Sequence, residues 1–92
     1  RITLKHLRKK KVDLSADALA FSMRNSFGDR VLGPEYPYIS KIRNYYHKNL
    51  LLKIENKSSI RNAKQILSMI LDNFSSHSEF KAIRIVIDVD LL

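Results

Sequence analysis

Two carboxylates near the end of the chain have the spacing of an acid–base or cation-binding pair. Asp88 and Asp90 stand two residues apart in a strand-like run, so both side chains would point the same way, about 6.5–7 Å apart. Such a pair could hold a divalent cation or act as general acid and base. The sequence favours the alternative that they neutralise cations on neighbouring strands, with Arg1, Lys5 and Lys53 as candidates.

Other catalytic and cofactor-binding patterns are missing from the sequence. The two glycines, Gly28 and Gly33, belong to no phosphate-binding motif. His6, His47 and His77 are far apart, and the chain has no cysteine, which excludes a disulfide and argues against a zinc site. We therefore predict no catalytic residue, no metal ligand and no cofactor in this chain.

All four tyrosines fall between residues 36 and 48, where cations stand among them. The stretch contains Tyr36, Tyr38, Tyr45 and Tyr46 together with Lys41, Arg43, His47 and Lys48. Aromatic rings stack on bases while cations meet phosphates, a combination typical of single-stranded nucleic-acid binding. The alternative is that the tyrosines pack along a hairpin as cross-strand pairs.

The charge balance indicates a polyanionic partner. Among 92 residues, 17 Lys and Arg face 9 Asp and Glu, a net charge of +8. This excess favours nucleic acid first and an anionic membrane second, unless an acidic remainder of a longer protein offsets it. No apolar run approaches the roughly 20 residues that cross a bilayer. The length of 92 residues suits a single domain, residues 1–92. Because the sequence lacks a starting Met, we expect this domain to be part of a longer protein.

Hydrophobic periodicity predicts six main elements. Residues 1–6 alternate as a strand, and residues 7–11 form a basic turn with four consecutive cations. A helix follows, capped by Asp13 or Ser15 and ended by Gly28. The apolar stripe of this helix comprises Ala16, Leu19, Ala20, Met23 and Phe27. Residues 30–34 open a second strand, which two nearby prolines confine to an edge, bulge or loop.

The second half of the chain continues this pattern. Residues 38–46 pair with residues 49–55 as a long hairpin, and Ser58 or Ser59 caps a second helix. The stripe of that helix comprises Ile60, Ala63, Leu67, Ile70, Leu71 and Phe74, and a last strand covers residues 83–90. The order predicts an α+β domain of the ferredoxin-like split βαβ type (βαββαβ), with two helices on one face of a four-stranded sheet.

Several of these segments together resemble one family, the C-terminal domain of the primosomal replication-restart DNA helicase (PriA, primosomal protein N′). The matching residues are Phe27 to Pro37, Ile39, Ile42-Arg43, Tyr45-Tyr46, Leu50 to Lys53 and Ile87 to Asp90. Two positions depart from the family pattern. Lys41 stands where Arg is frequent, and Leu91 replaces a closing Pro.

The resemblance implies an accessory domain with no catalysis of its own. The parent would be a bacterial, cytoplasmic and nucleoid-associated helicase whose ATP, magnesium and zinc sites lie outside this chain. The domain would contact single-stranded or forked DNA, other helicase domains and the acidic tail of single-stranded DNA-binding protein during primosome assembly, with no membrane partner. Carried onto this sequence, the DNA-binding residues are Lys41, Arg43, Tyr45, Tyr46 and Lys48, while Gly33, Pro34 and Pro37 shape the loop.

Two other classes of protein fit the same basic domain. One is a docking module whose basic surface serves only protein partners, and the other is an RNA-binding protein of ribosomal type. Salt dependence separates DNA binding from docking, because binding through several phosphates falls by orders of magnitude between about 50 and 200 mM salt.

Overall fold

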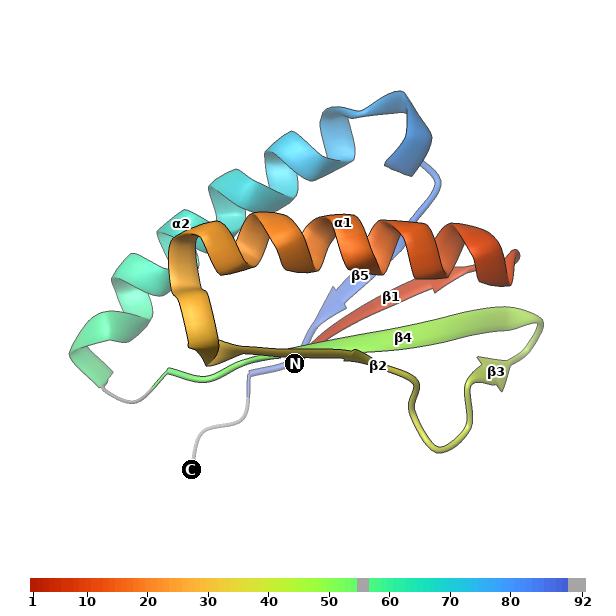
Figure 1. Cartoon of the computed structure of the whole chain (residues 1–92), viewed down its shortest axis with the longest axis horizontal. Helices are drawn as coiled ribbons and strands as arrows, with labels where there is room; N and C mark the ends of the chain where they lie inside the picture. Colours follow the sequence, from red (N-terminus) through yellow and green to blue (C-terminus); the bar gives the residue numbers. More distant parts are fainter. Residues whose placement is uncertain (55–56, 90–92) are drawn as a thin grey trace.

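The computed structural model describes residues 1–54 and 57–89 of the chain (Figure 1). Within these ranges, two α-helices pack on a five-stranded antiparallel sheet. The elements in chain order are β1 (Ile2–His6), α1 (Lys9–Phe27), the 3₁₀ turn η1 (Gly28–Arg30), β2 (Val31–Glu35), β3 (Lys41–Ile42), β4 (Tyr45–Leu52), α2 (Lys57–Ser76), the 3₁₀ turn η2 (Ser78–Phe80) and β5 (Arg84–Ile87). The predicted α+β class is confirmed, whereas the predicted count of four strands is wrong because β3 forms separately.

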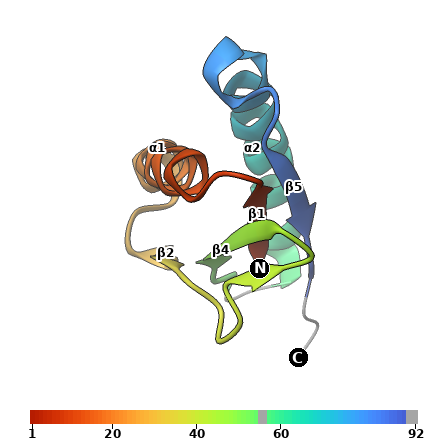
Figure 2. The ribbon, with the colours of Figure 1, turned by 90° about the vertical axis from the view of Figure 1, so that its right-hand side faces the viewer.

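The molecule has two layers. The strands follow the order β2-β4-β1-β5, and the short β3 pairs with the start of β4. Both helices lie on one side of the sheet, so its other side is left open by the described residues (Figure 2). The molecule measures 38 × 29 × 18 Å, which fits one helical layer on one sheet. We call the uncovered side the open face and the other side the helix face.

Alternation along the strands builds the core on the helix face. Ile2 and Leu4 of β1 and Leu50 of β4 are fully buried, and β1 lies between β4 and β5. From α1, the predicted stripe supplies the buried residues Ala16, Leu19, Ala20 and Met23, with Phe27 packed at its margin. From α2, Leu67, Ile70 and Leu71 of the predicted stripe pack against the same cluster. Phe74 belongs to the cluster and stacks on Phe80 with ring centroids 4.5 Å apart.

The end of α1 was predicted correctly and its start was not. Gly28 ends the helix with φ +58°, a conformation that costs glycine least. The helix begins at Lys9, ahead of both predicted caps, so the expected basic turn is largely its first turn. Lysine is a good helix former, and Ser15 donates its hydroxyl to the carbonyl of Val12 from inside the helix.

The second strand is an edge strand with an irregularity, as its prolines predict. β2 pairs only with β4 among the described strands, and the register shifts between Leu32 and Glu35. Gly33 lies in this shift with φ +98°, and its carbonyl accepts a hydrogen bond from the Arg24 guanidinium of α1. Glycine is required because a Cβ here would lie 2.9 Å from the backbone oxygen of Asn49.

The hairpin differs from the prediction. Its turn is at Arg43 and Asn44, both with positive φ, so Tyr45 and Tyr46 belong to the second strand and not to the first. Two central residues with φ above zero define the tight turn that suits the twist of a hairpin, and asparagine is favoured there. The first strand, β3, is therefore only two residues long, whereas β4 runs for eight residues across the sheet.

The last two elements also begin or end away from their predicted bounds. α2 starts at Lys57, ahead of the predicted caps Ser58 and Ser59. β5 covers Arg84–Ile87, a shorter strand than predicted, with Ile83 buried just before it. The predictions that concern Glu55, Asp90 and Leu91 fall outside the described residues.

Candidate nucleic-acid interface

The five predicted DNA-binding residues lie on one hairpin, but the structure distributes them over different surfaces. Lys48 contacts α1 and therefore marks the helix face of β4. Because side chains alternate along a strand, Tyr46 shares that face, whereas Tyr45 points to the open face. Arg43 is exposed in the turn, and Lys41 opposes Tyr46 in the register of β3 with β4.

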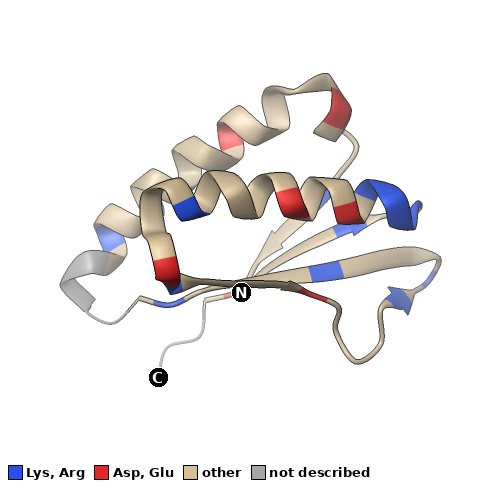
Figure 3. Cartoon of the chain, viewed as in Figure 1, with Lys and Arg blue, Asp and Glu red and all other residues tan. Residues whose placement is uncertain are grey.

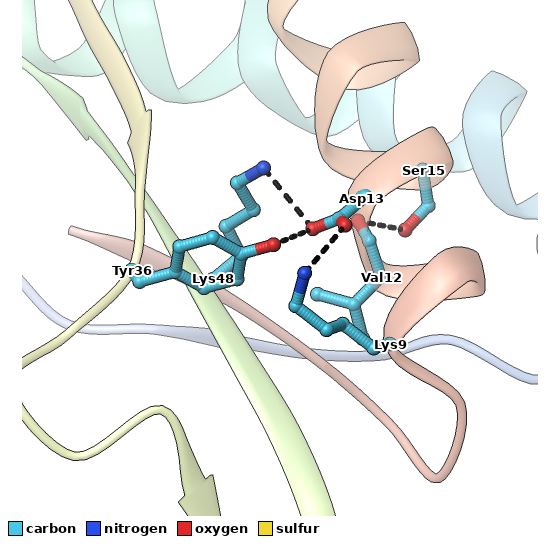
Figure 4. Close-up of polar contacts among 6 residues, drawn as sticks. All are labelled: Lys9, Val12, Asp13, Ser15, Tyr36 and Lys48. Carbon is cyan, nitrogen blue, oxygen red and sulfur yellow. Dashed lines mark hydrogen bonds and ion pairs between the residues drawn. The ribbon is translucent and has the colours of Figure 1, made fainter.

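Lys48 is held by an ion-pair cluster that no sequence motif indicated. Its ammonium lies 3.1 Å from Oδ1 of Asp13, and its side chain is only 13% exposed. Lys9 approaches Oδ2 of the same carboxylate at 3.6 Å, and the hydroxyl of Tyr36 donates a hydrogen bond to Oδ1 (Figure 4). Both ammonium groups also lie over the Tyr36 ring, at 5.1 Å for Lys9 and 4.6 Å for Lys48. We call these four residues the Asp13 cluster.

The Asp13 cluster serves the fold and removes Lys48 from the set available to a phosphate. Burial alone would raise the pKa of Asp13, but the hydrogen bond from Tyr36 and the pairing with Lys48 and Lys9 outweigh it and lower that pKa. The carboxylate therefore stays ionised and joins α1, β4 and the segment after β2. Of the five predicted residues, Lys48 is the one whose surroundings favour a structural role.

The hairpin itself carries a cation over an aromatic ring. The Lys41 ammonium lies 5.0 Å from the ring centroid of Tyr46, and Lys41 is exposed. Arg43, next to this pair, occupies the left-handed region with φ +50°, where a side chain other than glycine, asparagine or aspartate is uncommon. Further out, Tyr38 is fully exposed in the loop between β2 and β3.

A second pair of this kind forms on the open face from residues far apart in the sequence. The Arg84 guanidinium of β5 lies 5.0 Å from the ring centroid of Tyr45. Lys5 of β1 pairs with Arg84 on one side and with His47 of β4 on the other. These three residues, which we call the basic row, cross three adjacent strands beside Tyr45. The sequence indicated Lys5 only as a partner for the terminal carboxylates and did not single out Arg84, although the alternation of β1 and β5 could have placed both on one face.

The cations of the basic row differ from Lys48 in their surroundings. Among the described residues, the ion pairs join Arg1 to Asp88, Lys9 to Asp13 and Lys48 to Asp13. Lys5 and Arg84 have no carboxylate partner within that part of the chain. Lys and Arg also gather at the end of the molecule formed by the start of α1 and the β3–β4 hairpin, which we call the hairpin end (Figure 3).

The protonation of His47, in the basic row, makes the stability of the domain depend on pH. Partial burial, and then the charge of Lys5, lower its pKa, while Arg84, Lys41 and Glu35 are the other charged groups on the strands around it. The folded protein thus binds fewer protons than the unfolded chain below about pH 6.5. We expect the free energy of unfolding to fall as pH drops from 7 through that range, and to fall less in His47→Gln. Urea unfolding of both proteins at three pH values measures this, and equal slopes would contradict it.

The carboxylate of Asp88 is paired, in line with the favoured interpretation of the terminal acids. Its Oδ2 lies 3.3 Å from a guanidinium nitrogen of Arg1, and its backbone N–H donates to the carbonyl of Arg1 at 2.8 Å. Asp90 lies outside the described residues, so the carboxylate pair as such is not observed. Of the predicted loop-shaping residues, Gly33 and Pro34 lie in the irregular part of β2, and Pro37 follows in the loop after it.

An apolar groove lies away from the hairpin, between α2 and the neighbouring strands. It encloses about 760 Å³. Its lining is mainly aliphatic, including Leu52, Ile54, Leu67 and Ile87, with Arg1, Lys53, Lys64, Asp72 and Asp88 also lining it.

The described part of the chain contains neither a cluster of metal-ligating side chains nor a helix that could span a membrane. No group of three metal-ligating side chains is found among residues 1–54 and 57–89. No helix in the described ranges combines the length and apolar character that a bilayer crossing requires.

The comparisons with known proteins assign no relative to the chain. No protein-family model matches it, and neither a curated protein nor a solved structure matches it.

Proposed function

We propose that this chain is a non-catalytic domain that binds single-stranded or forked DNA, as part of a replication-restart helicase of the kind its sequence resembles. One observation carries the proposal. At the hairpin end, Arg84 lies over the ring of Tyr45 and Lys41 lies over the ring of Tyr46. Neither cation has a carboxylate partner among the described residues. Aromatic faces for bases beside cations for phosphates suit a single strand with little sequence preference.

The position of Arg43 supports the same function. A residue in the left-handed region at a turn costs less when it is glycine or asparagine. An exposed arginine at this position is therefore unfavourable for folding, and contact with phosphate at the tip of the hairpin would explain it.

The finer fold assignment is part of this proposal. The strand order β2-β4-β1-β5 with antiparallel neighbours supports a ferredoxin-like split βαβ sheet to which β3 has been added through the hairpin. In such a sheet the helices occupy one face and leave the other for ligands.

The apolar groove favours docking of the acidic tail of single-stranded DNA-binding protein as a second activity. Apolar side chains would take the hydrophobic end of such a tail, and Lys53 and Lys64 line the same groove. Asp88 is already paired with Arg1, which leaves Asp72 as the opposing carboxylate among the lining residues.

The proposal is tested by fluorescence anisotropy of labelled single-stranded, forked and RNA oligonucleotides at about 50 and 200 mM salt. We expect the Arg43→Ala/Tyr45→Ala variant to bind single-stranded DNA about tenfold or more weakly, because a stacked base contributes about 1–3 kcal/mol and a phosphate contact is also lost. The matched control is Arg61→Ala/Phe21→Ala, which also removes an exposed cation and an exposed aromatic ring, but from the helices.

Each outcome separates the alternatives. Salt-sensitive binding that only the hairpin variant weakens supports the DNA site, provided that circular dichroism shows both variants folded. No binding by the wild-type domain at low salt would sink autonomous DNA binding and leave docking as the function. Tighter binding of RNA than of DNA of the same sequence would favour the ribosomal-type alternative.

A further inference from the structure

The basic row is a site that the hairpin residues do not include. Arg84, Lys5 and His47 come from three different strands, and the register places them side by side across the sheet. At the usual separation of neighbouring strands, the row spans about 10 Å from β5 to β4. Among the described elements, both helices lie on the opposite side, so the row faces outward (Figure 2).

The surroundings of the row provide surfaces for bases as well as for phosphates. At one end, Tyr45 holds the guanidinium of Arg84 over its ring, and a guanidinium plane can itself stack with a base. Beyond the row, the open face continues with Val86, Leu51 and Leu32, which are 40%, 39% and 41% exposed. Exposed aliphatic side chains next to unpaired cations can contact unstacked bases.

We propose that a single strand of DNA crosses the open face of the sheet over the basic row, with phosphates at Lys5 and Arg84 and a base against the Tyr45–Arg84 pair. This inference rests on the proposed function and names the path of the strand beyond the hairpin. The strand would run across the β-strands, from β5 towards β4 and the hairpin turn. His47 lies at the β4 end of the row, where a nearby phosphate would accept a hydrogen bond from its imidazole and stabilise the protonated form.

The test compares two double variants with equal loss of charge. Lys5→Gln/Arg84→Gln removes two cations from the open face, and Lys10→Gln/Lys11→Gln removes two from the first turn of α1, on the other side of the sheet. We expect the first variant to bind single-stranded DNA about tenfold or more weakly. The slope of log affinity against log salt should become less steep by about 1.4, the value for two lost phosphate contacts on a single strand. We expect the second to bind less than about threefold more weakly, with the wild-type slope.

A second measurement uses the wild-type protein, so its result does not depend on whether the variants fold. Titration of the ¹⁵N-labelled domain with an oligothymidylate should shift the amides of Lys5, His47 and Arg84, together with those of the hairpin. Shifts confined to the hairpin, or equal weakening in the two double variants, would overturn the path across the open face while leaving DNA binding intact. Absence of any DNA binding by the wild-type domain would instead remove the proposed function, and this path with it.

Discussion

Alanine in place of Gly33 is expected to destabilise the domain by about 3 kcal/mol or more. Two independent costs act at this position. The φ of +98° is unfavourable for a residue with a side chain, and the new Cβ would lie 2.9 Å from the backbone oxygen of Asn49 and 3.2 Å from the backbone nitrogen of Glu35. Backbone atoms of a paired strand cannot give way without breaking the β2–β4 register.

Gly28 provides the matched control for this prediction. It also has a positive φ, but a Cβ there would meet no atom within 4 Å. Gly28→Ala should therefore cost only the backbone term, about 1–2 kcal/mol. In thermal unfolding, where about 1 kcal/mol corresponds to 4–8 °C for a domain of this size, Gly33→Ala should melt clearly below Gly28→Ala. Equal melting temperatures would contradict the role assigned to the contact with Asn49.

Replacing Asp13 with alanine should have the second large effect, a loss of about 1–3 kcal/mol. The change leaves the Tyr36 hydroxyl without its acceptor and the ammonium of Lys48, on a side chain only 13% exposed, without its carboxylate. Asp17→Ala is the matched control, because it removes the same charge one turn further along α1 from an exposed residue. Urea unfolding should place Asp17→Ala within about 0.5 kcal/mol of wild type.

The Asp13 cluster also predicts how acid unfolds the domain. The pKa of Asp13 is lowered in the folded state, so its contribution to stability is present above its ordinary value of 3.8 and is lost as pH falls through the lowered pKa. The difference in unfolding free energy between wild type and Asp13→Ala should therefore shrink at the most acidic pH. A difference that is constant between pH 7 and pH 2.5 would show that the carboxylate acts through packing instead of charge.

Hydrophobic periodicity and glycine positions predicted those parts of the fold that depend on residues close together in the sequence. The alternation of Ile2 and Leu4 identified a half-buried strand, and the stripe of α1 identified its buried side. Gly28 marked the end of that helix, since glycine has no Cβ and adopts the positive φ found there at low cost. The hairpin turn was misplaced because Arg43 carries no turn signal, and Asn44 alone did not outweigh the tyrosines beside it.

The candidate site depended on contacts that the sequence separates. Tyr36 and Lys48 are 23 and 35 residues from Asp13, so nothing in the motif around the tyrosines indicated that Lys48 is already neutralised. Arg84 reaches Tyr45 only because β5 pairs with β1 and β1 with β4. The residue types on the hairpin were thus predictable, whereas their division between a structural cluster and an open surface required the topology of the sheet.

The uneven distribution of charge has a kinetic consequence. Lys and Arg are concentrated at the hairpin end of a molecule whose longest dimension is 38 Å, so the charge distribution is polarised along its length (Figure 3). In the field of a polyanion, such a dipole experiences a torque that turns the hairpin end forward before contact. Orientation during the encounter would raise the association rate at low ionic strength, and added salt would slow association by screening that field.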